Sequence, residues 1–142
     1  MLILLLVICV LFLPFYTIYK PPDFVIRYCQ YRWPYVFWRI STSSKIVALT
    51  VDDGPSEYTN EIMQILAANG AVATFFIIGP KVIGRESMLQ ELIRNGNELA
   101  NHAMHDEPSR SLSDATLTGE IQSVEELLHS AYAAVDAERP PK

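Results

Sequence analysis

The 142-residue sequence has little cysteine and few basic side chains. Its two cysteines, Cys9 and Cys29, both lie in the first forty residues, so no disulfide framework staples the rest and no zinc-finger spacing occurs. Eleven Lys and Arg residues against sixteen Asp and Glu residues give a formal net charge of −5. The basic residues are scattered, whereas proteins that bind phosphate backbones carry them in a patch or stripe. The composition therefore argues against a disulfide-stapled miniprotein and against nucleic acid as a partner.

Charge is absent from the N-terminal segment. Leu2–Tyr19 carries no charged side chain, and a bilayer core of ~30 Å needs about 20 apolar residues. No basic residue precedes this run and no small-residue cleavage pattern follows it, which favours an uncleaved transmembrane or signal-anchor segment over 1–19 rather than a signal peptide or a buried helix. Residues 20–44 are rich in aromatic and basic side chains and predict a juxtamembrane linker.

Beyond residue 44, short apolar runs alternate with amphipathic segments. Gly70 stands where a helix C-terminus needs a positive φ, and Ser113 can cap the last helix. The regular alternation predicts an α/β fold whose parallel strands are joined by crossover helices. The expected elements are strand 45–51, helix 57–69, strand 72–78, helix 87–94, strand 98–101 and helix 113–134.

Polar residues at the ends of these strands form two clusters. Asp52 and Asp53 follow the first strand, and His102, His105 and Asp106 follow the third. Adjacent carboxylates repel each other unless a cation separates them, so the pair suggests one metal ligand and one base, although a solvated turn would also contain these residues. Histidines three apart can both ligate a divalent ion, and Asp106 adds a carboxylate option.

Four segments, the last two overlapping, resemble a known family. Thr50–Ser56, T-V-D-D-G-P-S, resembles the T-F-D-D-G-P signature of the polysaccharide deacetylases, which form the NodB-homology or carbohydrate esterase family 4 domain. The segments A-T-F-F-I-I-G and G-N-E-L-A-N-H resemble that family's second strand and second motif, and N-H-A-M-H-D-E-P-S is most similar to fungal chitin-deacetylase-like members. For residues 45–142 the resemblance implies the first half of a distorted (β/α) barrel of parallel strands. It also implies metal-dependent deacetylation of an N-acetylglucosamine polysaccharide such as chitin.

The resemblance also implies roles for single residues. Asp52 matches the general base, Asp53 the metal-ligating carboxylate and His102 the first ligand histidine, with zinc expected as the divalent metal and cobalt or a similar ion as the alternative. The family's second histidine stands four residues after the first, where this chain has Asp106, and His105 is one residue early. Because imidazole suits zinc, His105 is the expected third ligand, and Asp106 is the alternative because the ungapped register favours it.

The family's later motifs, including the Leu-x-x-His that supplies the general acid, are expected beyond Lys142, which makes 45–142 a partial domain. Wall-directed chemistry would place this domain on the extracellular or lumenal side of a single-pass membrane protein. The basic residues within 20–44 would by themselves favour the cytoplasm, so the orientation stays open. The alternative to an active enzyme is a catalytically inactive membrane-anchored fragment or paralogue that at most binds metal or glycan.

Overall fold

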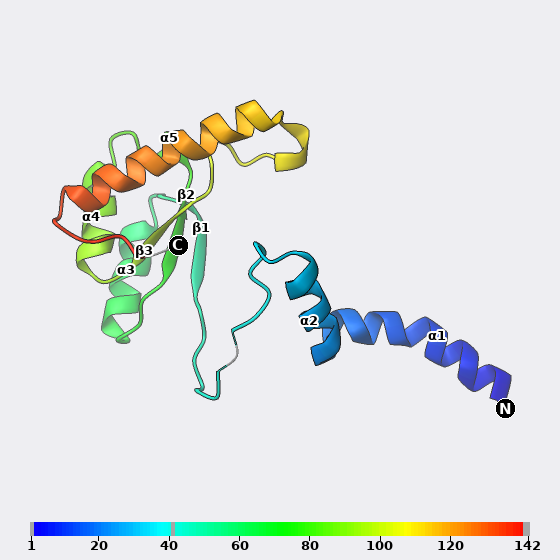
Figure 1. The fold of residues 1–142 in the computed structure, drawn as a ribbon. Coiled ribbons are helices and arrows are strands. Elements are labelled where there is room, and N and C mark those ends of the chain that lie inside the picture. Colours follow the sequence, from blue (N-terminus) through cyan, green and yellow to red (C-terminus); the bar gives the residue numbers. More distant parts are fainter. Residues whose placement is uncertain (1, 41, 141–142) are drawn as a thin grey trace. The chain divides into compact units, whose positions relative to one another are not determined.

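The computed structural model describes residues 2–40 and 42–140. The chain divides into two compact units, Met1–Lys45 and Ile46–Lys142. In the first unit, helix α1 spans Leu2–Tyr19 (Figure 1). The side chains of residues 2–9 and 11 lie outside the described part of the chain. Within the part that is described, no helix has the length and apolar character needed to cross a membrane. The transmembrane or signal-anchor segment over 1–19 stays a prediction.

The segment predicted as a linker contains a second helix. Helix α2 spans Asp23–Arg32, with an acidic residue in its first turn and a basic residue in its last, which is the arrangement that the helix dipole favours. Arg39 Nη2 donates a hydrogen bond to Asp23 Oδ1 at 2.6 Å. This hydrogen bond and the nearby Arg39 charge hold the pKa of Asp23 below its ordinary value. The aromatic and basic composition of residues 20–44 obscured the helical pattern in the sequence.

The second unit is built on a sheet of three parallel strands in the order β1-β2-β3 (Figure 1). The α/β fold predicted from the alternation is therefore confirmed. In chain order the elements are β1 Thr50–Gly54, α3 Thr59–Ala68, β2 Thr74–Ile77, the 3-10 turn η1 Gly79–Val82, α4 Glu86–Arg94, β3 Glu98–Asn101, the 3-10 turn η2 Ser109–Ser111 and α5 Asp114–Ala133.

The first strand begins later than predicted. Strand β2 offers a partner only from Thr74, which lies opposite Thr50 in the parallel register. Residues 46–49, whose apolar pattern suggested a buried strand, are instead exposed. The strand also ends later than predicted, at Gly54, so Asp52 and Asp53 lie inside β1 rather than after its end. The third strand has the bounds predicted for it.

Helix ends follow the sequence signals. Gly70 follows the end of α3 with a φ of +61°, the left-handed conformation that glycine adopts without strain. Ser113 caps α5, because its side chain accepts a hydrogen bond from Thr116 N at 3.1 Å. Both features were predicted from the sequence, and the cap fixes where α5 leaves the loop that follows β3.

Helices α4 and α5 pack against β3 and against each other. The buried apolar side chains of the core come mainly from these elements and from α3, β2 and η1, and burial of such a side chain typically contributes about 1.5–3 kcal/mol. Asn97 is one of the few buried polar residues, and its Oδ1 accepts a hydrogen bond from Ala73 N at 3.0 Å. The completely buried side chains of this core include Phe75, Ile77, Leu92, Val124 and Leu128.

Candidate metal centre

The backbone of β1 is irregular at its two aspartates. Asp53 has a φ of +60°, and the pairing of β1 with β2 shifts register between Val51 and Gly54. Side chains alternate between the two faces of a regular strand, and a bulge of this kind re-aims a side chain. Lys81 Nζ donates a hydrogen bond to the carbonyl oxygen of Asp53 at 2.8 Å. The turn that follows β2 therefore holds Asp53 in its unusual conformation.

The loop after β3 is tied to the loop after β2. His102 N donates to Ile77 O at 3.0 Å, and Gly79 N donates to Ala103 O at 3.1 Å. Ala103 has a φ of +59° and its N–H donates to Asn101 Oδ1 at 2.8 Å, which turns the chain sharply after His102. These contacts set the position at which the His102 side chain leaves the sheet.

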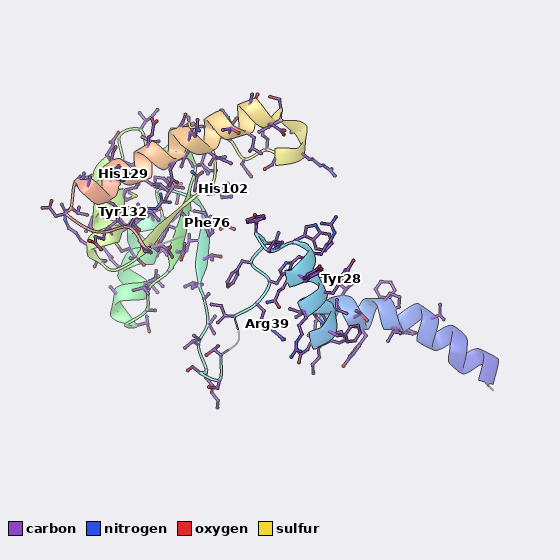
Figure 2. All side chains as sticks on the ribbon, in the orientation of Figure 1. Tyr28, Arg39, Phe76, His102, His129 and Tyr132 are labelled. Atoms are coloured by element: carbon purple, nitrogen blue, oxygen red, sulfur yellow. The ribbon has the colours of Figure 1, made fainter. Side chains whose placement is uncertain are left out.

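An aromatic ring supports the His102 imidazole. Figure 2 shows Phe76 and His102 together, and their rings meet edge to face with centroids 6.4 Å apart. Phe76 lies on β2, the strand between the two strands that carry the polar clusters. The His102 side chain is 28% exposed, so the imidazole is partly packed and partly accessible to solvent.

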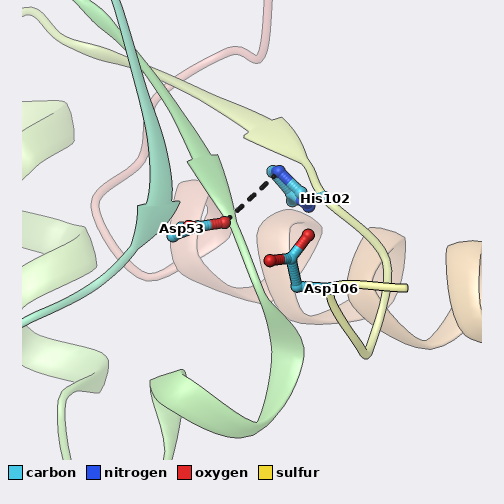
Figure 3. Close-up of side chains that lie close together, drawn as sticks. All are labelled: Asp53, His102 and Asp106. Carbon is cyan, nitrogen blue, oxygen red and sulfur yellow. Dashed lines mark ion pairs between the residues drawn. The ribbon is translucent and has the colours of Figure 1, made fainter. Parts of the chain in front are cut away.

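Asp53, His102 and Asp106 converge at this end of the sheet (Figure 3). One ligand atom from each lies within 4.8 Å of the others, and His102 Nε2 is 3.5 Å from Asp53 Oδ1. That distance is long for a hydrogen bond. Two ligands at about 2.1 Å from a tetrahedral metal lie roughly 3.4 Å apart. The spacing and the oxygen and nitrogen donors therefore fit a divalent metal ion.

His105 does not join this group. Its Nδ1 lies 3.1 Å from Glu120 Oε1, and the other carboxylate oxygen of Glu120 accepts a hydrogen bond from Met104 N at 3.3 Å. His105, Glu107 and Glu120 form a separate set of potential metal ligands. The structure therefore brings the alternative third ligand, Asp106, to Asp53 and His102, and turns the expected one, His105, towards Glu120 on α5.

Asp52 is exposed on β1 and belongs to neither group of potential ligands found among the described residues. A general base must reach the reacting water and must not itself be bound to the metal. The exposed position of Asp52 outside both ligand groups is compatible with that requirement. Its catalytic role stays a prediction.

A cleft of about 390 Å³ opens beside His102. Phe76 and the α5 residues Leu117 and Ile121 form apolar parts of its wall, and His105 and Glu107 contribute polar groups. Such a mixed lining suits a ligand with both ring faces and polar substituents.

Sequence reasoning missed Lys81 and Glu120, which hold the two polar clusters in place. Both act through contacts with residues far away in the sequence, so no local motif marked them. Glu120 lies on α5 with a side chain only 11% exposed, although its sequence neighbourhood predicted no more than an amphipathic helix.

Comparisons with known proteins identify one family. The sequence model of the polysaccharide deacetylases matches residues 39–141. A peptidoglycan-N-acetylglucosamine deacetylase of Bacillus cereus is 35% identical over 88 residues, which are 61% of this chain and 41% of the relative. A chitin deacetylase of Pestalotiopsis is 32% identical over 98 residues, which are 66% of this chain and 33% of the relative.

Similar solved structures are also deacetylases or carbohydrate esterases. A T48 deacetylase with substrate superposes with a TM-score of 0.60 at 31% identity, covering 63% of this chain and 45% of that protein. A family 4 carbohydrate esterase from Streptomyces lividans in complex with acetate has a TM-score of 0.57 at 30% identity, covering 60% and 44% respectively. The chain spans less than half the length of each of these relatives.

Proposed function

Because the chain belongs to the polysaccharide deacetylase family, we propose that it supplies the metal-binding part of a site that deacetylates an N-acetylglucosamine polysaccharide of the chitin type. The observation that carries this proposal is the convergence of Asp53, His102 and Asp106, with Asp52 adjacent in β1. The three-strand sheet is then the first half of a distorted (β/α) barrel. The polymers named for the relatives, chitin and peptidoglycan, share the N-acetylated amino sugar that this chemistry requires.

In the proposed mechanism Asp53, His102 and Asp106 would hold a divalent metal. When bound, such a metal would supply Lewis acidity and lower the pKa of a bound water towards neutrality. The Asp52 carboxylate takes the proton of the water that attacks the amide carbon. Asp52 then returns this proton to the amide nitrogen, the C–N bond breaks, and acetate and the free amine of the sugar are released. The cleft beside His102 holds the sugar ring, with Phe76, Leu117 and Ile121 as its apolar wall.

Acetate release from chitin oligomers tests this function in the gene product that contains residues 1–142. We expect release by the parent protein and its loss in Asp52→Asn and in Asp53→Asn. Asp136→Asn is the matched control, because Asp136 is exposed and its positive φ is one that asparagine also tolerates. Equal acetate release by Asp52→Asn and the parent would refute the assignment of the base.

An inactive fragment that only binds metal or glycan remains the second candidate. The observation that favours it is the share of each relative that aligns with this chain. Each matched relative is more than twice as long as the aligned segment. Metal binding without acetate release from chitin or peptidoglycan would support this alternative over the enzyme.

A further inference from the structure

We propose that Asp106, not His105, is the third ligand, and that the resulting site of two carboxylates and one imidazole discriminates less between zinc and manganese than a two-histidine site would. This inference rests on the proposed function for the existence of a metal site. It adds the composition of that site and the class of ion it prefers.

The first support is the placement of the two candidate side chains. A ligand atom of Asp106 lies within 4.8 Å of those of Asp53 and His102 (Figure 3). The imidazole of His105 instead has its Nδ1 at 3.1 Å from Glu120. Asp106 can therefore ligate without leaving its position, whereas His105 would first have to leave a carboxylate partner that is itself largely buried.

The second support is the way in which the loop is anchored. Met104 N donates to Glu120 Oε2, and the Met104 side chain covers Gly79 so closely that a Cβ on the glycine would meet its sulfur at 2.2 Å. A register shift of one residue, as needed to put His105 at the place of Asp106, would move Met104 out of this contact. It would also break the bond from Gly79 N to Ala103 O. The packing around Gly79 thus selects Asp106.

The chemistry of the donors gives the consequence. Imidazole suits zinc, whereas carboxylate oxygens suit harder ions such as manganese and magnesium. With Asp106 the site offers two carboxylates and one imidazole, in place of one carboxylate and two imidazoles. Zinc still binds more tightly than manganese to most such sites, so the expected effect is a smaller ratio between the two affinities, not a reversal.

The test measures the dissociation constants of Zn²⁺ and Mn²⁺ for the purified chain by competition with a chromophoric chelator. We expect His105→Ala to leave both constants unchanged and Asp106→Ala to weaken both. Asp106→His should raise the zinc-to-manganese affinity ratio on the order of tenfold, because it exchanges a hard donor for an imidazole. Circular dichroism verifies that each variant is folded.

The outcomes separate this inference from the proposed function. Loss of metal in His105→Ala with retention in Asp106→Ala would overturn the ligand assignment, and an unchanged affinity ratio in Asp106→His would overturn the claim about ion preference. If the parent chain binds neither ion, or if Asp53→Ala binds both as well as the parent does, the metal site itself is refuted.

Discussion

Replacing Tyr132 by phenylalanine removes a single hydroxyl group from the free edge of the sheet. Glu98 and His102 donate their backbone N–H groups to Ala73 and Ile77, so by alternation the N–H of Leu99 faces away from β2. There it donates a hydrogen bond to Tyr132 Oη at 3.0 Å. Tyr132 is only 4% exposed and thus shields this bond from water.

The expected cost of Tyr132→Phe follows from this burial. Phenylalanine fills nearly the same volume, so the main loss is the partner of a buried N–H group, which typically costs about 1–3 kcal/mol. Urea denaturation followed by circular dichroism should show a lower midpoint with an unchanged slope. Tyr58→Phe is the matched control, because Tyr58 is 60% exposed and its replacement should change stability by less than about 0.5 kcal/mol. An equally small effect for Tyr132→Phe would refute the argument that Tyr132 closes the edge of β3.

Two further predictions concern Lys81 and the first unit. Lys81→Met should weaken zinc binding about tenfold, because it removes the hydrogen bond to the Asp53 carbonyl; tenfold is the lower end of the effect typical of residues that orient a metal ligand. The control in the chelator assay is Lys45→Met at an exposed position. Equal dissociation constants for Lys81→Met and the parent would contradict the role of Lys81 in positioning Asp53. Arg39→Gln should raise the pKa of Asp23 towards its ordinary value in an NMR titration. Any stabilisation from the lowered pKa is present above the carboxyl's ordinary pKa and is lost as the pH falls. An unchanged titration would refute the pairing.

The sequence predicted the order of elements in the second unit because each signal is local. Apolar periodicity marked the helices, and Gly70 and Ser113 marked a helix end and a cap that the structure reproduces. The predicted start of β1 was wrong because a strand begins only where a neighbouring strand can pair with it. That point is set by the pairing of Thr50 with Thr74, which the local sequence does not reveal. Helix α2 was missed within a segment whose composition suggested a linker.

The candidate site was predictable in part. Asp53 and His102 carried a motif and a resemblance, and the structure brings them together with Asp106, the alternative to the expected His105. The choice between His105 and Asp106 could not be made from the sequence, because it depends on Glu120, a residue on a helix that begins after the loop. Localisation on the extracellular or lumenal side of a membrane stays a prediction.

The central claim is that Asp53 holds a divalent metal while Asp52 remains free to act as a base. Its most direct test is the metal content of the purified chain after incubation with Zn²⁺ and dialysis, measured by atomic emission spectroscopy for the parent, Asp52→Asn and Asp53→Asn. We predict a single bound ion for the parent and for Asp52→Asn, and none for Asp53→Asn. Retention of the ion by Asp53→Asn, or its loss in Asp52→Asn, would contradict this account.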